Sequence, residues 1–178
     1  MTNLTILATG PDLLGDGVRG TEPVVRETIR RASREIHMLA YSISAGGMRI
    51  VDLLGEALER GVRVVLVVNR VHEMGGPAAH ALLDLNRRHD RFTLGSFADP
   101  GGGDLHAKVL VADREAAVIG SANMSRRGMA GNIEIGVLIR DGSCWKLADM
   151  IDGMADRFAV PKRPGGTGAP DRRRARVG

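Results

Sequence analysis

A histidine and a lysine lie two residues apart in the segment LHAKVLVAD, which covers residues 105–113. The tail of this segment, VLVA, is typical of a buried strand, where an imidazole or an ammonium group needs a partner or solvent. Side chains alternate between the faces of a strand, so His106 and Lys108 are predicted to point the same way. An imidazole that titrates near neutral pH, set beside a cation, suits chemistry on an anionic substrate.

Further residues follow this pair at fixed distances. Asp113 comes after four intervening residues, and the tetrapeptide GSAN, residues 120–123, comes after six more. This His-x-Lys-x4-Asp-x6-Gly-Ser-x-Asn pattern resembles the signature of the phospholipase D superfamily, with every spacing kept. The segment NIEIG adds Glu134 on the next predicted strand, where that family has a carboxylate. The helix–strand order before the motif is also similar, and the likeness extends roughly over residues 21–158.

The resemblance implies a metal-independent phosphodiesterase that works through a phosphohistidine. A neutral imidazole can attack phosphorus, and a protonated one can supply the leaving oxygen with a proton. Two copies of His106, one from each chain of a dimer, would fill both roles. Hydrogen-bond donors are needed around the phosphate oxygens. The residues expected to supply them are Lys108, Ser121 and Asn123.

Three other residues complete the expected site. By the same resemblance, Glu134 acts in catalysis by orienting a histidine through its second ring nitrogen. Asp113 lies seven residues from His106, so its side chain is predicted to face away from the site. Asp113 and Gly120 are both expected to have structural roles. We expect no cofactor. A metal site on His106 is not expected either, because lysine is a poor ligand and no cluster of further ligands accompanies the pair.

The motif occurs once, because none of the other four histidines has a lysine two residues later. Members of the family build one site from two motifs. The small single-motif members resemble bacterial endonucleases that assemble the site across the two-fold axis of a homodimer. A symmetric dimer is also the commonest closed assembly. The motif count therefore predicts a homodimer with a composite active site.

The substrate is left partly open by the sequence. Nucleic acid is the leading prediction, and the sequence does not distinguish DNA from RNA. Single-motif proteins that resemble this chain occur in prokaryotic phage-defence or restriction systems. In such a system, other proteins of a complex would be partners. A phospholipid phosphodiesterase or transferase is the first alternative, because the superfamily includes such enzymes. A non-catalytic module that binds phosphate or nucleic acid within a larger complex is the second.

Charge is distributed unevenly along the chain. The formal net charge is +4, but residues 161–178 carry six Lys or Arg and one Asp, which leaves −1 for residues 1–160. We predict a catalytic domain over 1–160 and a disordered basic tail over 161–178, since the tail is rich in Pro, Gly and Arg. Arginines that could contact phosphates in a sequence-independent way are Arg126, Arg127, Arg172, Arg173 and Arg174.

The remaining features place the motif in an α/β fold. One cysteine excludes a disulfide framework. The start, MTNLTILATGPDLLG, is not typical of a secretory signal and no segment approaches about 18 apolar residues, so a cytoplasmic protein without a membrane span is expected. Apolar periodicity predicts a mixed sheet with helices on both faces, the α-β-α sandwich that the family implies. Predicted strands are 4–8, 35–44, 62–68, 92–97, 105–112, 116–120 and 133–140, and predicted helices are 21–32, 50–58, 78–88 and 147–158.

Overall fold

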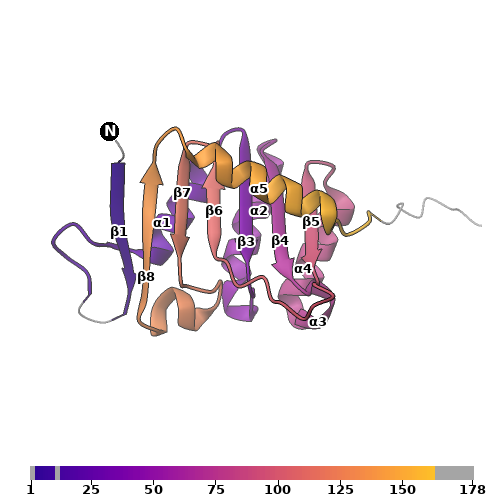
Figure 1. Ribbon diagram of the computed structural model, residues 1–178, viewed down its shortest axis with the longest axis horizontal. Coiled ribbons are helices and arrows are strands. Elements are labelled where there is room, and N and C mark those ends of the chain that lie inside the picture. Colours follow the sequence, from indigo (N-terminus) through magenta and orange to yellow (C-terminus); the bar gives the residue numbers. More distant parts are fainter. Residues whose placement is uncertain (1–2, 11–12, 163–178) are drawn as a thin grey trace, which may run out of the picture.

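The computed structural model describes residues 3–10 and 13–162 (Figure 1). A single mixed sheet of eight strands crosses the molecule in the order β2-β1-β8-β7-β6-β3-β4-β5. The strands are β1 Asn3–Thr9, β2 Arg19–Gly20, β3 Glu35–Ala40, β4 Arg63–Asn69, β5 Phe92–Phe97, β6 Val109–Ala112, β7 Ala116–Gly120 and β8 Glu134–Arg140. β3, β4 and β5 run parallel, whereas β3, β6, β7, β8 and β1 pair antiparallel in turn.

Helices cover both faces of this sheet, which confirms the predicted fold class. One face is crossed by α5, Cys144–Arg157, drawn in yellow in Figure 1, and the others lie behind the sheet. These are α1 Thr21–Arg31, α2 Met48–Glu59, the single turn α3 Val71–Met74 and α4 Gly76–Arg88. A 3-10 turn at Ala45–Gly47 and a π turn at Arg127–Gly131 lie in loops.

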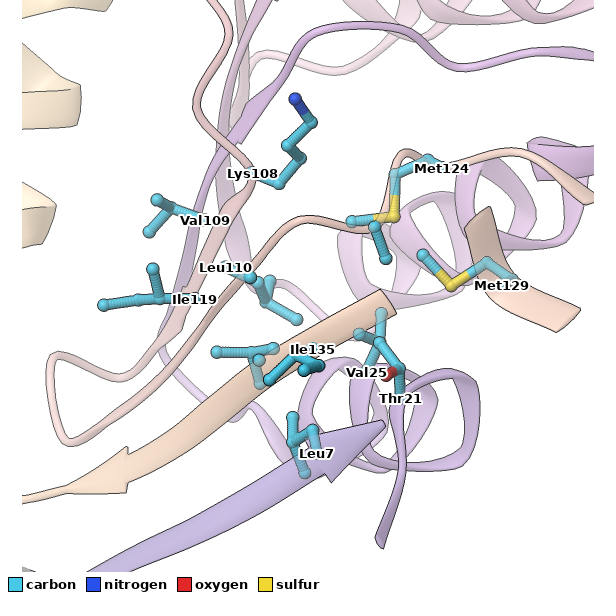
Figure 2. A pocket seen from close by; sticks show the side chains of 14 residues that line it. Leu7, Thr21, Val25, Lys108, Val109, Leu110, Ile119, Met124, Met129 and Ile135 are labelled. Atoms are coloured by element: carbon cyan, nitrogen blue, oxygen red, sulfur yellow. The ribbon is translucent and has the colours of Figure 1, made fainter. Parts of the chain in front are cut away.

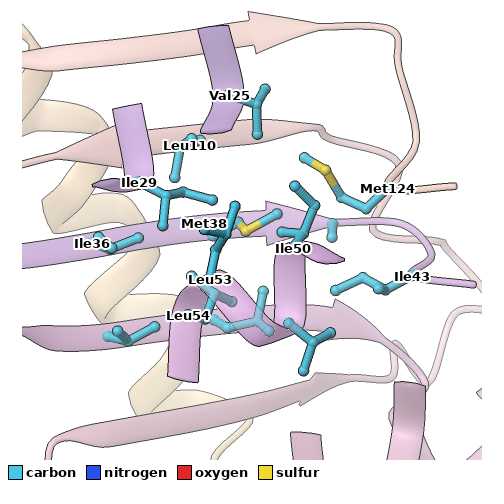
Figure 3. Packing of buried hydrophobic residues seen from close by; sticks show 14 of the residues in the cluster. Val25, Ile29, Ile36, Met38, Ile43, Ile50, Leu53, Leu54, Leu110 and Met124 are labelled. Atoms are coloured by element: carbon cyan, nitrogen blue, oxygen red, sulfur yellow. The ribbon is translucent and has the colours of Figure 1, made fainter. Parts of the chain in front are cut away.

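The core is almost wholly aliphatic and consists of two layers. The larger layer packs α1, α2 and α4 against the sheet, and Figure 3 shows Ile29 of α1 and Leu54 of α2 meeting Met38 of β3. The smaller layer lies between α5 and the opposite face of the sheet. Each fully buried aliphatic side chain contributes about 1.5–3 kcal/mol, so these two layers fix the sheet on which the motif is carried.

The motif strand is shorter than predicted. β6 begins at Val109 rather than at residue 105, because the Leu105 N–H is bonded to the Asn69 side chain and not to a neighbouring strand. Both faces of the strand are also apolar, since Leu110 belongs to the larger core layer and Val111 to the smaller one. His106 and Lys108 therefore precede the strand.

Helix α5 is rotated relative to the prediction. Its buried line is Cys144, Ala148, Ile151 and Ala155, whereas Met150, predicted on the apolar face, is 63% exposed. Small side chains let the helix lie close to the sheet: a Cβ built on Gly95 of β5 would be 3.5 Å from the Ala155 Cα. The predicted tail lies outside the described residues apart from Pro161 and Lys162, and so do Arg172, Arg173 and Arg174.

Candidate active site

Four strand ends meet at one edge of the sheet and carry the motif. β3 ends and β6 begins there, with Leu39 opposite Val109. β7 ends and β8 begins at the same edge, with Gly120 opposite Gly136. The segments that continue from these ends bring together the motif residues, which the sequence separates by up to 28 positions from His106 to Glu134.

His106 and Lys108 are in direct contact at this edge. The Lys108 Nζ lies 3.0 Å from the His106 Nδ1 and 3.3 Å from its Nε2, and it donates a hydrogen bond of 2.6 Å to the His106 carbonyl oxygen. Lys108 is only 7% exposed, whereas His106 is exposed. Burial lowers the pKa of the Lys108 ammonium, and the Glu134 carboxylate opposes this shift.

Tyr41 is a third member of the cluster that the sequence did not single out. Its ring centroid lies 4.8 Å from that of His106, with the planes tilted by 54°. The Lys108 Nζ lies 5.3 Å from the same ring centroid, within the range of a cation–π contact. Tyr41 directly follows β3, the strand that pairs with β6, and this is the signal that marks it.

Ser121 and Glu134 are bonded to each other. The Ser121 hydroxyl donates to the Glu134 carboxylate and accepts the Ile135 N–H at 3.2 Å. Asn132 donates to the other Glu134 oxygen at 2.9 Å. No hydrogen bond joins Glu134 to His106 within the described chain, so the orienting contact implied by the resemblance is not formed inside this chain.

Asn123 lies in a tightly packed loop. Its side chain forms no hydrogen bond to any described residue, and its Oδ1 is buried. The loop is held by the Ser44 N–H, which donates to the Met124 carbonyl at 3.1 Å. Close backbone contacts hold it further, because a Cβ on Gly47 would lie 2.1 Å from the Met124 oxygen and one on Gly128 would lie 2.3 Å from the Asn123 oxygen. The Nδ2 group of this half-buried residue also has no partner among the described residues and can donate to a ligand, whereas the buried Oδ1 is not reached from solvent.

A second missed residue, Asn69, holds the segment before His106. The Asn69 side chain accepts the Leu105 N–H at 2.9 Å and donates to the Asp104 carboxylate at 3.1 Å. Arg70, which adopts a left-handed φ of 43°, also donates to Asp104. The hydrogen bond from Asn69, followed by those from Arg70, holds the pKa of Asp104 below its usual range. Asn69 and Arg70 lie at the end of β4, far from the motif in the sequence. No local sequence pattern therefore predicts their contacts with the segment before His106.

The other predicted residues lie at various distances from this cluster. Asp113 is at the far end of β6, where its carboxylate accepts the backbone N–H groups of Ser33, Arg34 and Glu35. Gly120 lies so close to β8 that a Cβ there would be 3.1 Å from the Gly136 Cα. Arg126 and Arg127 are exposed beside the Asn123 loop.

A small cavity of about 20 Å³ lies on the inner side of Lys108 (Figure 2). Its lining is mostly aliphatic, with Met124, Met129 and Leu7 labelled in the figure. This volume suits about one water molecule. A phosphodiester does not fit there, so a substrate must approach His106 from its exposed side.

The arrangement provides several groups that metal-free chemistry on a phosphate needs: an exposed imidazole, an ammonium group in contact with it, and an amide side chain on a neighbouring loop. Among residues 3–10 and 13–162, no group of three or more His, Cys, Asp or Glu is arranged to hold a metal ion. In the same part of the chain, no helix is long and apolar enough to span a membrane.

Comparisons with known proteins found similar sequences and similar folds. The DISARM protein DrmC of Bacillus paralicheniformis is 30% identical over 142 residues, which cover 78% of this chain and 57% of the relative, so the chain spans little more than half of its length. Nuc of Salmonella typhimurium, a phospholipase D family member, superposes with a TM-score of 0.70 at 20% identity, covering 90% of this chain and 97% of Nuc. NucT from Helicobacter pylori gives a TM-score of 0.70 at 16% identity, covering 89% and 99%.

The family model described as "Cardiolipin synthase, PLD-like domain" matches residues 25–158, most of the described chain. These residues include the motif and every strand from β3 to β8. The chain therefore belongs to the phospholipase D superfamily.

Proposed function

We propose that the protein is a metal-independent phosphodiesterase that cleaves nucleic acid through a phosphohistidine. The observation that carries the proposal is the contact between the exposed His106 imidazole and the buried Lys108 ammonium, 3.0 Å apart at an open sheet edge. A phosphodiester needs a nucleophile, a proton for the leaving oxygen and positive charge near its other oxygens. This pair supplies the first and the last of these within one chain.

The reaction proceeds in two displacements. A neutral His106 nitrogen attacks phosphorus, a nitrogen–phosphorus bond forms, and the bond to the leaving oxygen breaks. A second His106, protonated and on the opposite side, gives its proton to that oxygen. The same histidine then takes a proton from water, whose oxygen attacks phosphorus and frees the first imidazole. Both histidines return to their starting protonation states.

The remaining residues have supporting roles in this proposal. Lys108 holds a non-bridging oxygen, Asn123 donates a further hydrogen bond to the phosphate, and Ser121 donates another once its hydroxyl turns from Glu134 to the substrate. Glu134 orients an imidazole once the composite site forms. Asp113 and Gly120 act structurally, because one carboxylate fixes the start of β3 and one missing side chain lets β7 approach β8. Arg126 and Arg127 contact the nucleic-acid backbone beside the site.

A homodimer supplies the second histidine, and an uncovered apolar face supports this part of the proposal. Leu7 of β1 and Leu138 of β8 are buried under α1. Side chains alternate along a strand, so the residues next to them in the sequence point to the opposite face of the sheet, which α5 covers over its central strands. On that face α5 begins beside Ile139, at the end of β8, and runs away from β1 and from the start of β8 (Figure 1), and Ile6 is 43% exposed and Ile135 65% exposed. This strip starts beside Glu134, so a second copy seated on it would lie next to the site.

The biological setting is also proposed. The relative named DISARM protein DrmC supports a role in a prokaryotic defence system, with other proteins of such a system as partners. This would be a cytoplasmic role, since the targets are nucleic acids inside the cell. The basic residues of the predicted tail, Arg172, Arg173 and Arg174, would add sequence-independent phosphate contacts.

One assay tests the reaction. The purified chain is incubated with labelled single-stranded DNA, double-stranded DNA, RNA and a phosphatidylglycerol vesicle, each with excess EDTA, beside the His106→Ala variant. The proposal predicts cleavage of a nucleic acid with EDTA present and none by the variant. Cleavage of the lipid alone would assign the phospholipid alternative. Binding without cleavage by either protein would assign the non-catalytic module, and a requirement for added Mg²⁺ would contradict the mechanism.

A further inference from the structure

Tyr41, the one tyrosine of the chain, contacts both His106 and Lys108. Its ring lies 4.8 Å from the His106 ring, and the Lys108 ammonium lies 5.3 Å from its centroid. Strand pairing brings the two segments together. β3 and β6 pair with Leu39 opposite Val109, and Tyr41, His106 and Lys108 lie beyond that pair, where both segments have left the ladder and the Tyr41 ring can reach both side chains.

We propose that Tyr41 is a positioning residue that holds the His106 imidazole and the Lys108 ammonium in their reactive arrangement through its ring. This inference rests on the function proposed above. An exposed imidazole next to an ammonium group has several rotamers open to it, and a ring packed against it removes most of them. A fixed imidazole needs less reorganisation before it attacks, which raises kcat more than it changes KM.

The state of Lys108 supports the same role. Among the described residues Lys108 forms no ion pair, although its side chain is 7% exposed. Its ammonium has a hydrogen bond to the His106 carbonyl, the two imidazole contacts and the face of the Tyr41 ring. The ring is the one of these partners that does not belong to His106. Tyr41 therefore holds the ammonium independently of the imidazole's own movements.

The ring and not the hydroxyl carries this role. The Tyr41 hydroxyl forms no hydrogen bond to any residue that the structure describes, whereas the ring makes both contacts. Tyr41→Phe keeps the ring, and Tyr41→Leu removes it but keeps apolar volume. A matched control exists at Phe97 and Phe158, whose rings also lie 4.8 Å apart, tilted by 55°. Phe158→Leu removes an aromatic pair of the same geometry.

The first readout does not depend on catalysis. The ring Cε1–H signal of His106, assigned by its loss in His106→Ala, is recorded by NMR in the wild-type chain and the three variants. A ring at this distance displaces the signal by its ring current. We expect the displacement to persist in Tyr41→Phe and Phe158→Leu and to vanish in Tyr41→Leu. An unchanged signal in Tyr41→Leu would overturn the inference, whether or not the wild type proves to be a nuclease.

The second readout is the steady-state kinetics on whichever nucleic acid the wild type cleaves. We expect Tyr41→Leu to lower kcat by about 10²-fold, the cost of a displaced catalytic group, with KM within about threefold. Tyr41→Phe and Phe158→Leu are expected to keep kcat within about twofold. An equal loss in Tyr41→Phe would assign the role to the hydroxyl and overturn the inference. A change confined to KM would make Tyr41 a substrate contact and would also overturn it.

Discussion

Two histidines lie near opposite ends of strand β3, and the groups around them differ. His37 is near the start of β3, and His106 precedes β6 beside the end of β3. His106 is exposed and lies against an ammonium group and a tyrosine ring. His37 lies under α5 with no exposed surface, 3.2 Å from Asp152 and 3.7 Å from Glu35. Arg63 and Arg114 bind the same two carboxylates and join α5 to the sheet.

The difference separates a reactive histidine from a structural one. Burial lowers the pKa of His37, and Asp152 and Glu35 oppose that shift. Its Nε2 contacts Asp152, and its Nδ1 is buried with no partner among the described residues, so a ligand from solvent does not reach the ring. At His106 the exposed face of the ring is open and the nearest charge is a cation, which attracts a phosphate to the same place. Exposure, together with carboxylate contacts at His37 and an ammonium contact at His106, thus distinguishes two clusters that share a residue type.

The largest effect is expected at the exposed histidine. His106→Ala should lower turnover by on the order of 10⁴-fold or more, because it removes both the nucleophile and the proton donor. Its free energy of unfolding should stay within about 0.5 kcal/mol, as for other exposed positions. Single-turnover cleavage and urea denaturation measure the two quantities. A mild loss of turnover would contradict the assignment of His106 as the reactive histidine and His37 as the structural one.

Ser121→Ala should have a smaller effect at the same end of the sheet. Loss of one donor to a phosphate oxygen costs about 2.7–4 kcal/mol of transition-state stabilisation, or roughly 10²–10³-fold in kcat. Ser33→Ala is the matched control, because this hydroxyl bonds Asp113 at 3.1 Å at the other end of β6. Its turnover should equal that of the wild type. A loss of turnover as complete as that of His106→Ala would assign Ser121 a role beyond donation.

The buried histidine should show the reverse pattern. His37→Ala should lower the free energy of unfolding by about 1–3 kcal/mol, since it leaves a gap and takes one partner from Asp152. Turnover per folded molecule should stay within about twofold. Denaturation curves and turnover, normalised to the folded fraction, check both. A stable variant with no activity would place His37 in the catalytic machinery and overturn the comparison.

The smallest effect is the pH dependence of stability. The pKa of His37 is lowered in the folded state, so the unfolded chain binds its proton first, near pH 6.5. Stability from this group is fully present above that pH and is lost as the pH falls toward the folded-state pKa, by at most about 1.4 kcal/mol per pH unit. Urea midpoints at several pH values between 5 and 8 should fall on acidification in the wild type. The slope should be flatter in His37→Ala, and equal slopes would contradict the assignment.

The sequence predicted the framework of the site better than its contacts. β5 and β7 match the predicted ranges 92–97 and 116–120, because short apolar runs between turns determine them locally. The extent of the motif strand was overestimated, since the Asn69 side chain takes the Leu105 N–H that a longer ladder would have used. Tyr41 was missed for a related reason. Its contact with His106 spans 65 positions and depends on the pairing of β3 with β6 and on the path of the chain beyond both strands, which one sequence does not reveal.

The most direct test of the central claim is to trap the covalent intermediate. The chain is mixed with an oligonucleotide labelled with ³²P at the scissile phosphate, with EDTA present, and is quenched in alkali, where phosphohistidine is stable. We predict a label on the protein that maps to the peptide containing His106 and is absent from His106→Ala. Label on another residue, or cleavage by the wild type with no labelled protein at any quench time, would contradict the account.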